Sequence, residues 1–74
     1  MQFQKPTAEQ LANRFVYHAP KGDQTDRYAA IRGECLKLAE KIVELTPCSP
    51  EQARALNALD EVMFLSNAAI ARNE

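Results

Sequence analysis

The sequence predicts an all-α protein in which two long helices form an antiparallel hairpin, preceded by a short helix and an extended arm. Capping boxes mark helix starts, apolar residues recur at helical spacing, and a connection of about three residues around Pro47 joins helices of about 22 residues each. Helices of similar length with so short a connection must fold back on each other. We divide the chain into residues 1–22, the short helix and arm, and residues 23–74, the hairpin domain, within one structural domain.

The N-terminal segment begins with a capping box and continues as an arm. In the box from Thr7 to Gln10 the threonine hydroxyl accepts from an orphan amide and the glutamine side chain reaches back, which predicts a short helix from Ala8 to about Asn13. The following residues 14–23 combine β-formers with proline and glycine, which favours an extended segment ending in a turn.

The first long helix is expected to begin near Gln24, with Asp23 or Thr25 as its cap, and to end before Pro47, because a proline excludes helical conformation from the residue that precedes it. Apolar residues spaced alternately by three and four predict one straight seam along it. The seam consists of Tyr28, Ile31, Cys35, Leu38, Ile42 and Leu45.

The second long helix is expected to follow a second capping box at residues 49–52, with Pro50 as its first residue, and to reach about Arg72. Its seam is formed by Leu56, Leu59, Met63 and Ile70. Residues 62–71 carry no charge, and Val62 to Leu65 point successively around the helix, as in a helix that is buried on all sides. Because the chain has no third long helix to cover this surface, we expect a homo-oligomer.

Composition excludes several classes of function. Nine Lys and Arg against ten Asp and Glu give a formal charge of −1, which provides no basic field for long DNA or RNA. No run of about 18 apolar residues and no signal-peptide core occurs, so we expect a cytoplasmic protein without membrane contact. Cys35 and Cys48 are expected to be free thiols, since one histidine and two distant cysteines do not make a metal site. No spacing signals a catalytic triad or a cofactor motif, so we expect neither an enzyme nor a cofactor.

Candidate ligand-binding residues lie in the arm. An extended chain displays Phe15 and Tyr17 on one side and His18 on the other, with Lys21 beyond the proline. Flat rings beside cations suit a ligand that carries nucleobases and phosphates. The alternative is that the two aromatic rings only hold the arm against the hairpin. Arg32, at the margin of the first seam, either reaches into an interface or keeps its charged end in water.

Several short motifs carry a resemblance that covers positions 15–72. They are the Phe-x-Tyr-His-x-Pro segment, residues 27–32, the turn at residues 46–49 and the terminal residues 66–71. Together they resemble the small phage proteins with the helical hairpin domain shared by anti-CBASS and Thoeris anti-defence sponges. The resemblance implies a protein that sequesters cyclic nucleotide second messengers of bacterial immunity in the host cytosol without cleaving them, assembled as a hexamer with ligand pockets between protomers.

The resemblance also assigns residues. It implies that Tyr17 stacks on the bases and that Arg32, fifteen positions later, takes the place of a phosphate-binding lysine. His18 and Lys21 are further candidates from the residues of the arm itself. Where an arginine would serve a cyclic trinucleotide, this chain has Ala68, which argues against that ligand. The expected ligand is therefore a cyclic dinucleotide. The alternatives are a cyclic ADP-ribose-type signal of Thoeris, or a purely structural or adaptor role.

Overall fold

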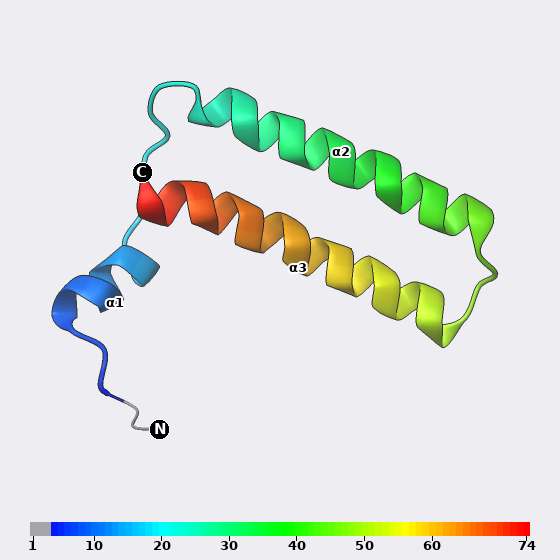
Figure 1. The fold of residues 1–74 in the computed structure, drawn as a ribbon, viewed down its shortest axis with the longest axis horizontal. Coiled ribbons are helices and arrows are strands. Elements are labelled where there is room, and N and C mark those ends of the chain that lie inside the picture. The colour runs from blue at the N-terminus through cyan, green and yellow to red at the C-terminus, as the bar shows by residue number, and fades with distance from the viewer. Residues whose placement is uncertain (1–3) are drawn as a thin grey trace.

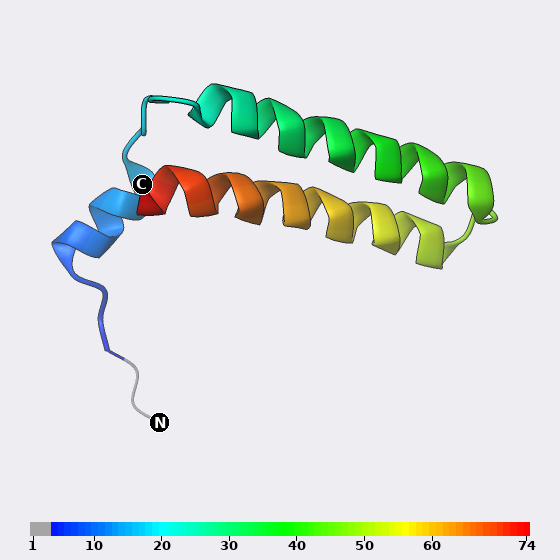
Figure 2. The same ribbon diagram turned by 45° about the horizontal axis from the view of Figure 1, so that its top comes forward.

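The computed structural model describes residues 4–74, which form three helices and no strand. Helix α1 spans Ala8–Phe15, α2 spans Gln24–Leu45 and α3 spans Pro50–Asn73. Helices α2 and α3 run antiparallel and side by side, whereas α1 lies beyond the open end of the hairpin, next to the C-terminus (Figures 1 and 2). The predicted helical hairpin with a short N-terminal helix is thus confirmed.

Helix α1 starts as its capping box predicts and ends later than expected. The Thr7 hydroxyl accepts from the amide of Gln10 at 3.1 Å, and the Gln10 side chain accepts from the amide of Thr7 at 2.8 Å. The helix then continues past Asn13 to Phe15, so the extended arm begins only at Val16. Phe15 and Tyr17 therefore do not lie on one side of a common extended segment, and that part of the prediction was wrong.

Helix α2 begins at Gln24 with Asp23, one of the two expected caps, as its N-cap residue, but no side-chain capping bond forms. Asp23 occupies the cap position without bonding a backbone amide, because its carboxylate accepts from Arg27 Nε at 3.1 Å, and Thr25 lies inside the helix. The Gln24 side chain instead accepts from the amide of Lys21 at 3.1 Å. This bond closes a turn in which Gly22 adopts a φ of 58°, a conformation that favours glycine.

The connection between the long helices is held by Gln52. Ser49 accepts from the Gln52 amide at 3.1 Å, as the capping prediction requires. The Gln52 side chain, however, donates to the carbonyl and hydroxyl oxygens of Thr46 at 3.1 and 3.0 Å, not to the backbone of Ser49. The second capping box is therefore only half formed, because the short loop brings an unpaired carbonyl at the end of α2 within reach.

The seam of α2 follows the prediction in its first half and drifts in its second. Leu38 and Leu45 are 52% and 73% exposed, so their assignment to the seam was wrong, and Ala39 is partly buried instead. A straight helix has 3.6 residues per turn, so a strict alternation of three and four drifts around it by about 20° per heptad. The partly buried residues of α2 are Arg27, Tyr28, Ile31, Cys35, Ala39 and Ile42.

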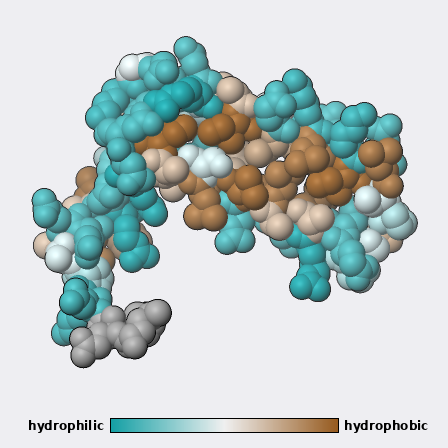
Figure 3. Space-filling model, in the orientation of Figure 1, coloured by the Kyte–Doolittle hydropathy of each residue, from teal (hydrophilic) through white to brown (hydrophobic). Residues whose placement is uncertain are grey.

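A single chain encloses almost no core. Among the described residues only Ile70 is a buried hydrophobic residue, whereas Val62, Phe64 and Leu65 are 53%, 64% and 62% exposed. Apolar side chains form a band along the hairpin that remains visible on the molecular surface (Figure 3). One partner helix covers only about one face of each helix, which leaves the other apolar faces of α3 open. Within residues 4–74, no helix is both long enough and apolar enough to cross a membrane.

Candidate functional site

A pocket of about 420 Å³ lies where the N-terminal segment meets the open end of the hairpin. Four of its residues are basic and none is acidic. We call it the arginine pocket; it is lined by Arg14, His18, Tyr28, Arg32, Asn67, Ala68, Ala71 and Arg72. Residues from α1, the arm, α2 and α3 thus contribute to one concave surface.

Helix α1 is attached to the end of α3 by two reciprocal hydrogen bonds. Asn13 Nδ2 donates to the carbonyl oxygen of Arg72 at 3.1 Å, and the Arg72 guanidinium donates to the carbonyl oxygen of Arg14 at 3.3 Å. The last carbonyls of a helix have no partner within that helix, so Asn13 satisfies one of them. This attachment brings Arg14 and Arg72 to the same pocket although they lie in different helices.

His18 enters the pocket because its ring folds back onto α1. Its Nε2 lies 2.7 Å from the carbonyl oxygen of Asn13. A carbonyl oxygen only accepts, so Nε2 carries the hydrogen and Nδ1 is left for another partner. The arm therefore returns toward the hairpin immediately after Tyr17.

A second set of contacts, outside the pocket, joins the beginning of α2 to Glu74. The Arg27 guanidinium donates to both carboxylate oxygens of Glu74, one of them at 2.8 Å. These bonds lower the pKa of Glu74 to about 2 and raise that of Arg27 above its ordinary value. Gln24, which is only 4% exposed, also donates to Glu74 at 3.5 Å. Together these bonds join the beginning of α2 to Glu74, the residue that follows α3.

The structure brings together two of the four candidate ligand-binding residues. Arg32 and His18 both line the arginine pocket. Tyr17 does not line it and is 82% exposed, and Lys21 lies outside it, with its backbone amide bonded to Gln24. Within a single chain, Tyr17 and Lys21 therefore do not join the site.

Four polar residues of the pocket were not among the ligand-binding residues predicted from the sequence. Arg14 and Arg72 add two cations, and Tyr28 was assigned only to the seam. Asn67 also lines the pocket, and its buried Oδ1 has no hydrogen-bond partner among the described residues. A buried acceptor without a hydrogen bond generally destabilises a protein by about 1–3 kcal/mol, and a ligand that supplies a donor would remove this cost. The sequence feature that could have pointed to Arg14 as a pocket residue is its position directly before the aromatic residues of the arm.

The alternative role considered for Phe15 was to pack the arm against the hairpin. The structure contradicts it, because Phe15 is 74% exposed and its ring lies 5.1 Å from the Arg14 guanidinium carbon. Polar bonds from Asn13 and Arg72 hold α1 instead. The two aromatic side chains of this segment are therefore open to the surroundings.

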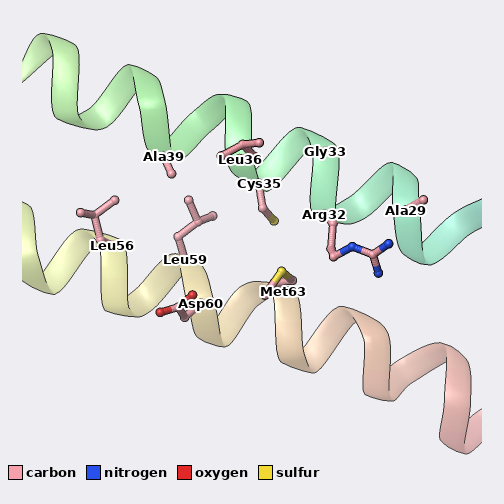
Figure 4. A pocket seen from close by; sticks show the side chains of 10 residues that line it. All are labelled: Ala29, Arg32, Gly33, Cys35, Leu36, Ala39, Leu56, Leu59, Asp60 and Met63. Carbon is pink, nitrogen blue, oxygen red and sulfur yellow. The ribbon is translucent and has the colours of Figure 1, made fainter.

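A second cavity, which we call the interhelical groove, runs between α2 and α3 with a volume of about 590 Å³ (Figure 4). It is largely apolar, with Arg32 and Asp60 as its charged residues. Its lining residues are Ala29, Arg32, Gly33, Cys35, Leu36, Ala39, Leu56, Leu59, Asp60 and Met63. Arg32 lines both cavities and so separates the groove from the arginine pocket.

The arginine pocket has the chemistry of an anion site. Guanidinium groups present several donors in a fixed plane that matches phosphate oxygens, and charge-assisted hydrogen bonds are the stronger ones. Three arginines and a histidine line it, and no carboxylate among its lining residues neutralises them. The partly buried ring of Tyr28 adds a flat surface beside them.

The chain matches a known protein family over most of its length. The model of the family described as "Acb2/Tad1, hairpin domain" matches residues 7–71, which includes α1, α2 and nearly all of α3. Comparison with curated proteins and with solved structures finds no match.

Proposed function

Because this chain belongs to the Acb2/Tad1 hairpin domain family, we propose that it is an anti-defence sponge, which binds cyclic dinucleotide second messengers of bacterial immunity and does not cleave them. It would act in the bacterial cytosol during phage infection, as a homo-oligomer, with hexamers as the expected form. The single observation that carries this proposal is the arginine pocket, which is lined by Arg14, His18, Arg32 and Arg72 and by no acidic residue.

The chemistry of the pocket favours a ligand with phosphates and bases. The guanidinium groups neutralise phosphate, while Tyr28 offers a ring on which a base stacks. In this proposal Arg32 and His18 keep the roles expected from the sequence, and Arg14 and Arg72 extend the cationic surface. Ala68 lines the pocket where a trinucleotide-binding relative is expected to have an arginine, so a dinucleotide is the better fit.

Tyr17 takes part only if a second copy is present. Its ring is 82% exposed and does not line the pocket of its own chain. In the assembly, the arm of one protomer would place Tyr17 at the pocket of another. The exposed Tyr17 ring and the near absence of a core in one chain both support this arrangement. Lys21, on the same arm, is a weaker candidate for the same ligand.

Isothermal titration calorimetry with cyclic dinucleotides tests the site. Arg32→Ala should weaken binding by about 1–3 kcal/mol, roughly ten- to hundredfold, and Arg32→Lys should retain part of the affinity because the charge survives without the planar fork. Tyr17→Ala should weaken binding by a similar amount through the lost stacking, while leaving the oligomer intact. The matched control is Arg54→Ala, since Arg54 lies exposed on α3 and lines neither cavity.

The outcomes separate three readings of the protein. Equal affinity of wild type, Arg32→Ala and Tyr17→Ala would place the ligand elsewhere. Binding of a cyclic ADP-ribose-type compound, with no affinity for cyclic dinucleotides, would favour the Thoeris signal as the ligand. A wild type that binds no cyclic nucleotide of any class would favour a structural or adaptor role.

A further inference from the structure

The interhelical groove contains two opposite charges that have no partner within the described part of the chain. Arg32 projects from α2 and Asp60 from α3, displaced from each other along the hairpin (Figure 4). The ion pairs formed between residues 4–74 involve other residues, namely Arg27, Lys37 and Lys41 with their carboxylates. An apolar groove with one unpaired cation and one unpaired anion is suited to a partner that carries the same two charges in the opposite order.

Nothing in the described chain covers this groove. Leu36, which lines it, is 61% exposed, and a Cβ atom added to Gly33 would meet no atom within 4 Å. Helix α1 lies at the end of the hairpin and does not extend over it (Figures 1 and 2). The groove therefore has room for another helix to approach the backbone of α2 closely at Gly33.

We propose that the groove is an interface between two copies of this chain, in which Arg32 of each copy pairs with Asp60 of the other. In a two-fold symmetric interface, a contact of residue i with residue j is repeated as j with i. A two-fold axis that lies in the interface, midway between Arg32 and Asp60, brings each cation opposite the partner's anion. A second copy thus satisfies both charges at once, and one pair of residues forms two ion pairs.

The apolar lining supports the same partner. Leu36, Leu59 and Met63 of one copy would meet the same residues of the other, which adds buried surface that a single chain lacks. Burial of an unpaired charge is costly, so the reciprocal pairing is what makes the groove usable as an interface. It also selects one register, because any sliding of the two copies separates both pairs.

This interface would also position a residue of the ligand site, a consequence that rests on the proposed function. Arg32 lines the groove and the arginine pocket. A guanidinium has five donors, so a carboxylate on one edge leaves the other edge for a phosphate. Asp60 of the second copy is then a positioning residue that holds Arg32 toward the ligand.

A charge-reversal cycle followed by sedimentation equilibrium tests the interface. Asp60→Arg and Arg32→Asp should each place like charges opposite one another and raise the dissociation constant of the assembly by about tenfold or more. The double variant restores opposite charges in reversed order, so it should assemble within about threefold of wild type. Glu61→Arg is the matched control, because Glu61 is the neighbouring exposed carboxylate on α3 and does not line the groove.

Far-ultraviolet circular dichroism establishes that each variant remains helical. If Asp60→Arg does not fold, Asp60→Asn removes the charge at nearly constant shape and should weaken assembly to a smaller degree. A monomeric wild type, single variants that assemble as wild type does, or a double variant no better than the weaker single variant would each overturn the proposal. The readout is assembly without ligand, so rescue in a protein that binds no cyclic nucleotide would support the interface and count against the sponge function alone.

Discussion

The guanidinium of Arg72 donates a hydrogen bond to the carbonyl oxygen of Arg14 at 3.3 Å, and so ties the end of α3 to the end of α1. Asn13 completes the attachment by donating to the carbonyl oxygen of Arg72. No buried residue lies on α1, so these polar bonds are what position the N-terminal cation of the arginine pocket. The shape of the pocket therefore depends on a small number of exposed hydrogen bonds.

Asn13→Ala should loosen α1 without unfolding the hairpin. The variant loses one hydrogen bond, which contributes about 0.5–1.5 kcal/mol in general, so opening of α1 should become several-fold more frequent. Hydrogen exchange would show faster exchange of amides in α1, with unchanged exchange in α2 and α3. Asn57→Ala, an exposed substitution on α3, is the control and should leave α1 unaffected. Unchanged exchange in α1 of Asn13→Ala would show that other contacts hold this helix.

Glu74 should make stability depend on pH in the acid range. Its pKa is lowered from 4.5 to about 2 by the Arg27 guanidinium, so the folded protein binds the proton more weakly than the unfolded chain. The stabilisation is fully present above pH 4.5 and is lost as the pH falls toward 2. The effect is small, because the Glu74 side chain is 42% exposed and is screened by solvent.

The measurement is the thermal midpoint of wild type and Glu74→Gln as a function of pH, at fixed protein concentration. The two curves should converge as the pH falls from 4.5 toward 2. Glu61→Gln, which removes an exposed carboxylate from the middle of α3 without an ion pair among the described residues, should run parallel to wild type. A constant difference between wild type and Glu74→Gln across this range would contradict the assigned bond.

Phe64→Glu should dissociate the assembly. Phe64 is 64% exposed in one chain and lies outside the interhelical groove, on the apolar surface of α3 that we expect other copies to cover. Burial of an unpaired carboxylate there costs several kcal/mol, so light scattering should show a smaller species. Ala55→Glu, nine residues earlier and therefore on the opposite side of the same helix, places an equal charge at an exposed position and should assemble normally. An intact assembly of Phe64→Glu would show that this face of α3 stays in solvent.

Local patterns predicted most of the fold. The Thr7 capping box, the proline at position 50 and the apolar spacing from Tyr28 to Cys35 gave the starts of α1 and α3 and the seam of α2 correctly. The predicted seam was wrong at Leu38, because residues spaced alternately by three and four drift around a straight helix of 3.6 residues per turn. Asp23 is the N-cap residue of α2, as one of the two predicted alternatives had it, but its carboxylate bonds to the Arg27 side chain instead of a backbone amide.

The candidate site was only partly predictable, for a different reason. His18 was found from residue type and position and Arg32 from the family resemblance, and both line the same pocket. Arg14 and Arg72 reach the pocket through a contact between residues 13 and 72, which are 59 positions apart in the sequence. No periodicity encodes such a contact, because it depends on where α1 comes to rest against the hairpin. Tyr17 does not line the pocket of its own chain, so its proposed role requires a second chain.

The proposed sponge function requires that the protein bind a cyclic dinucleotide and release it unchanged. The most direct measurement incubates the purified assembly with a stoichiometric amount of cyclic dinucleotide for several hours, separates the free compound, and heats the protein to release what it holds. Mass spectrometry of both fractions should find the free fraction depleted and the ligand recovered intact from the denatured protein. Full recovery of ligand in the free fraction, or its conversion to linear nucleotides, would contradict the claim.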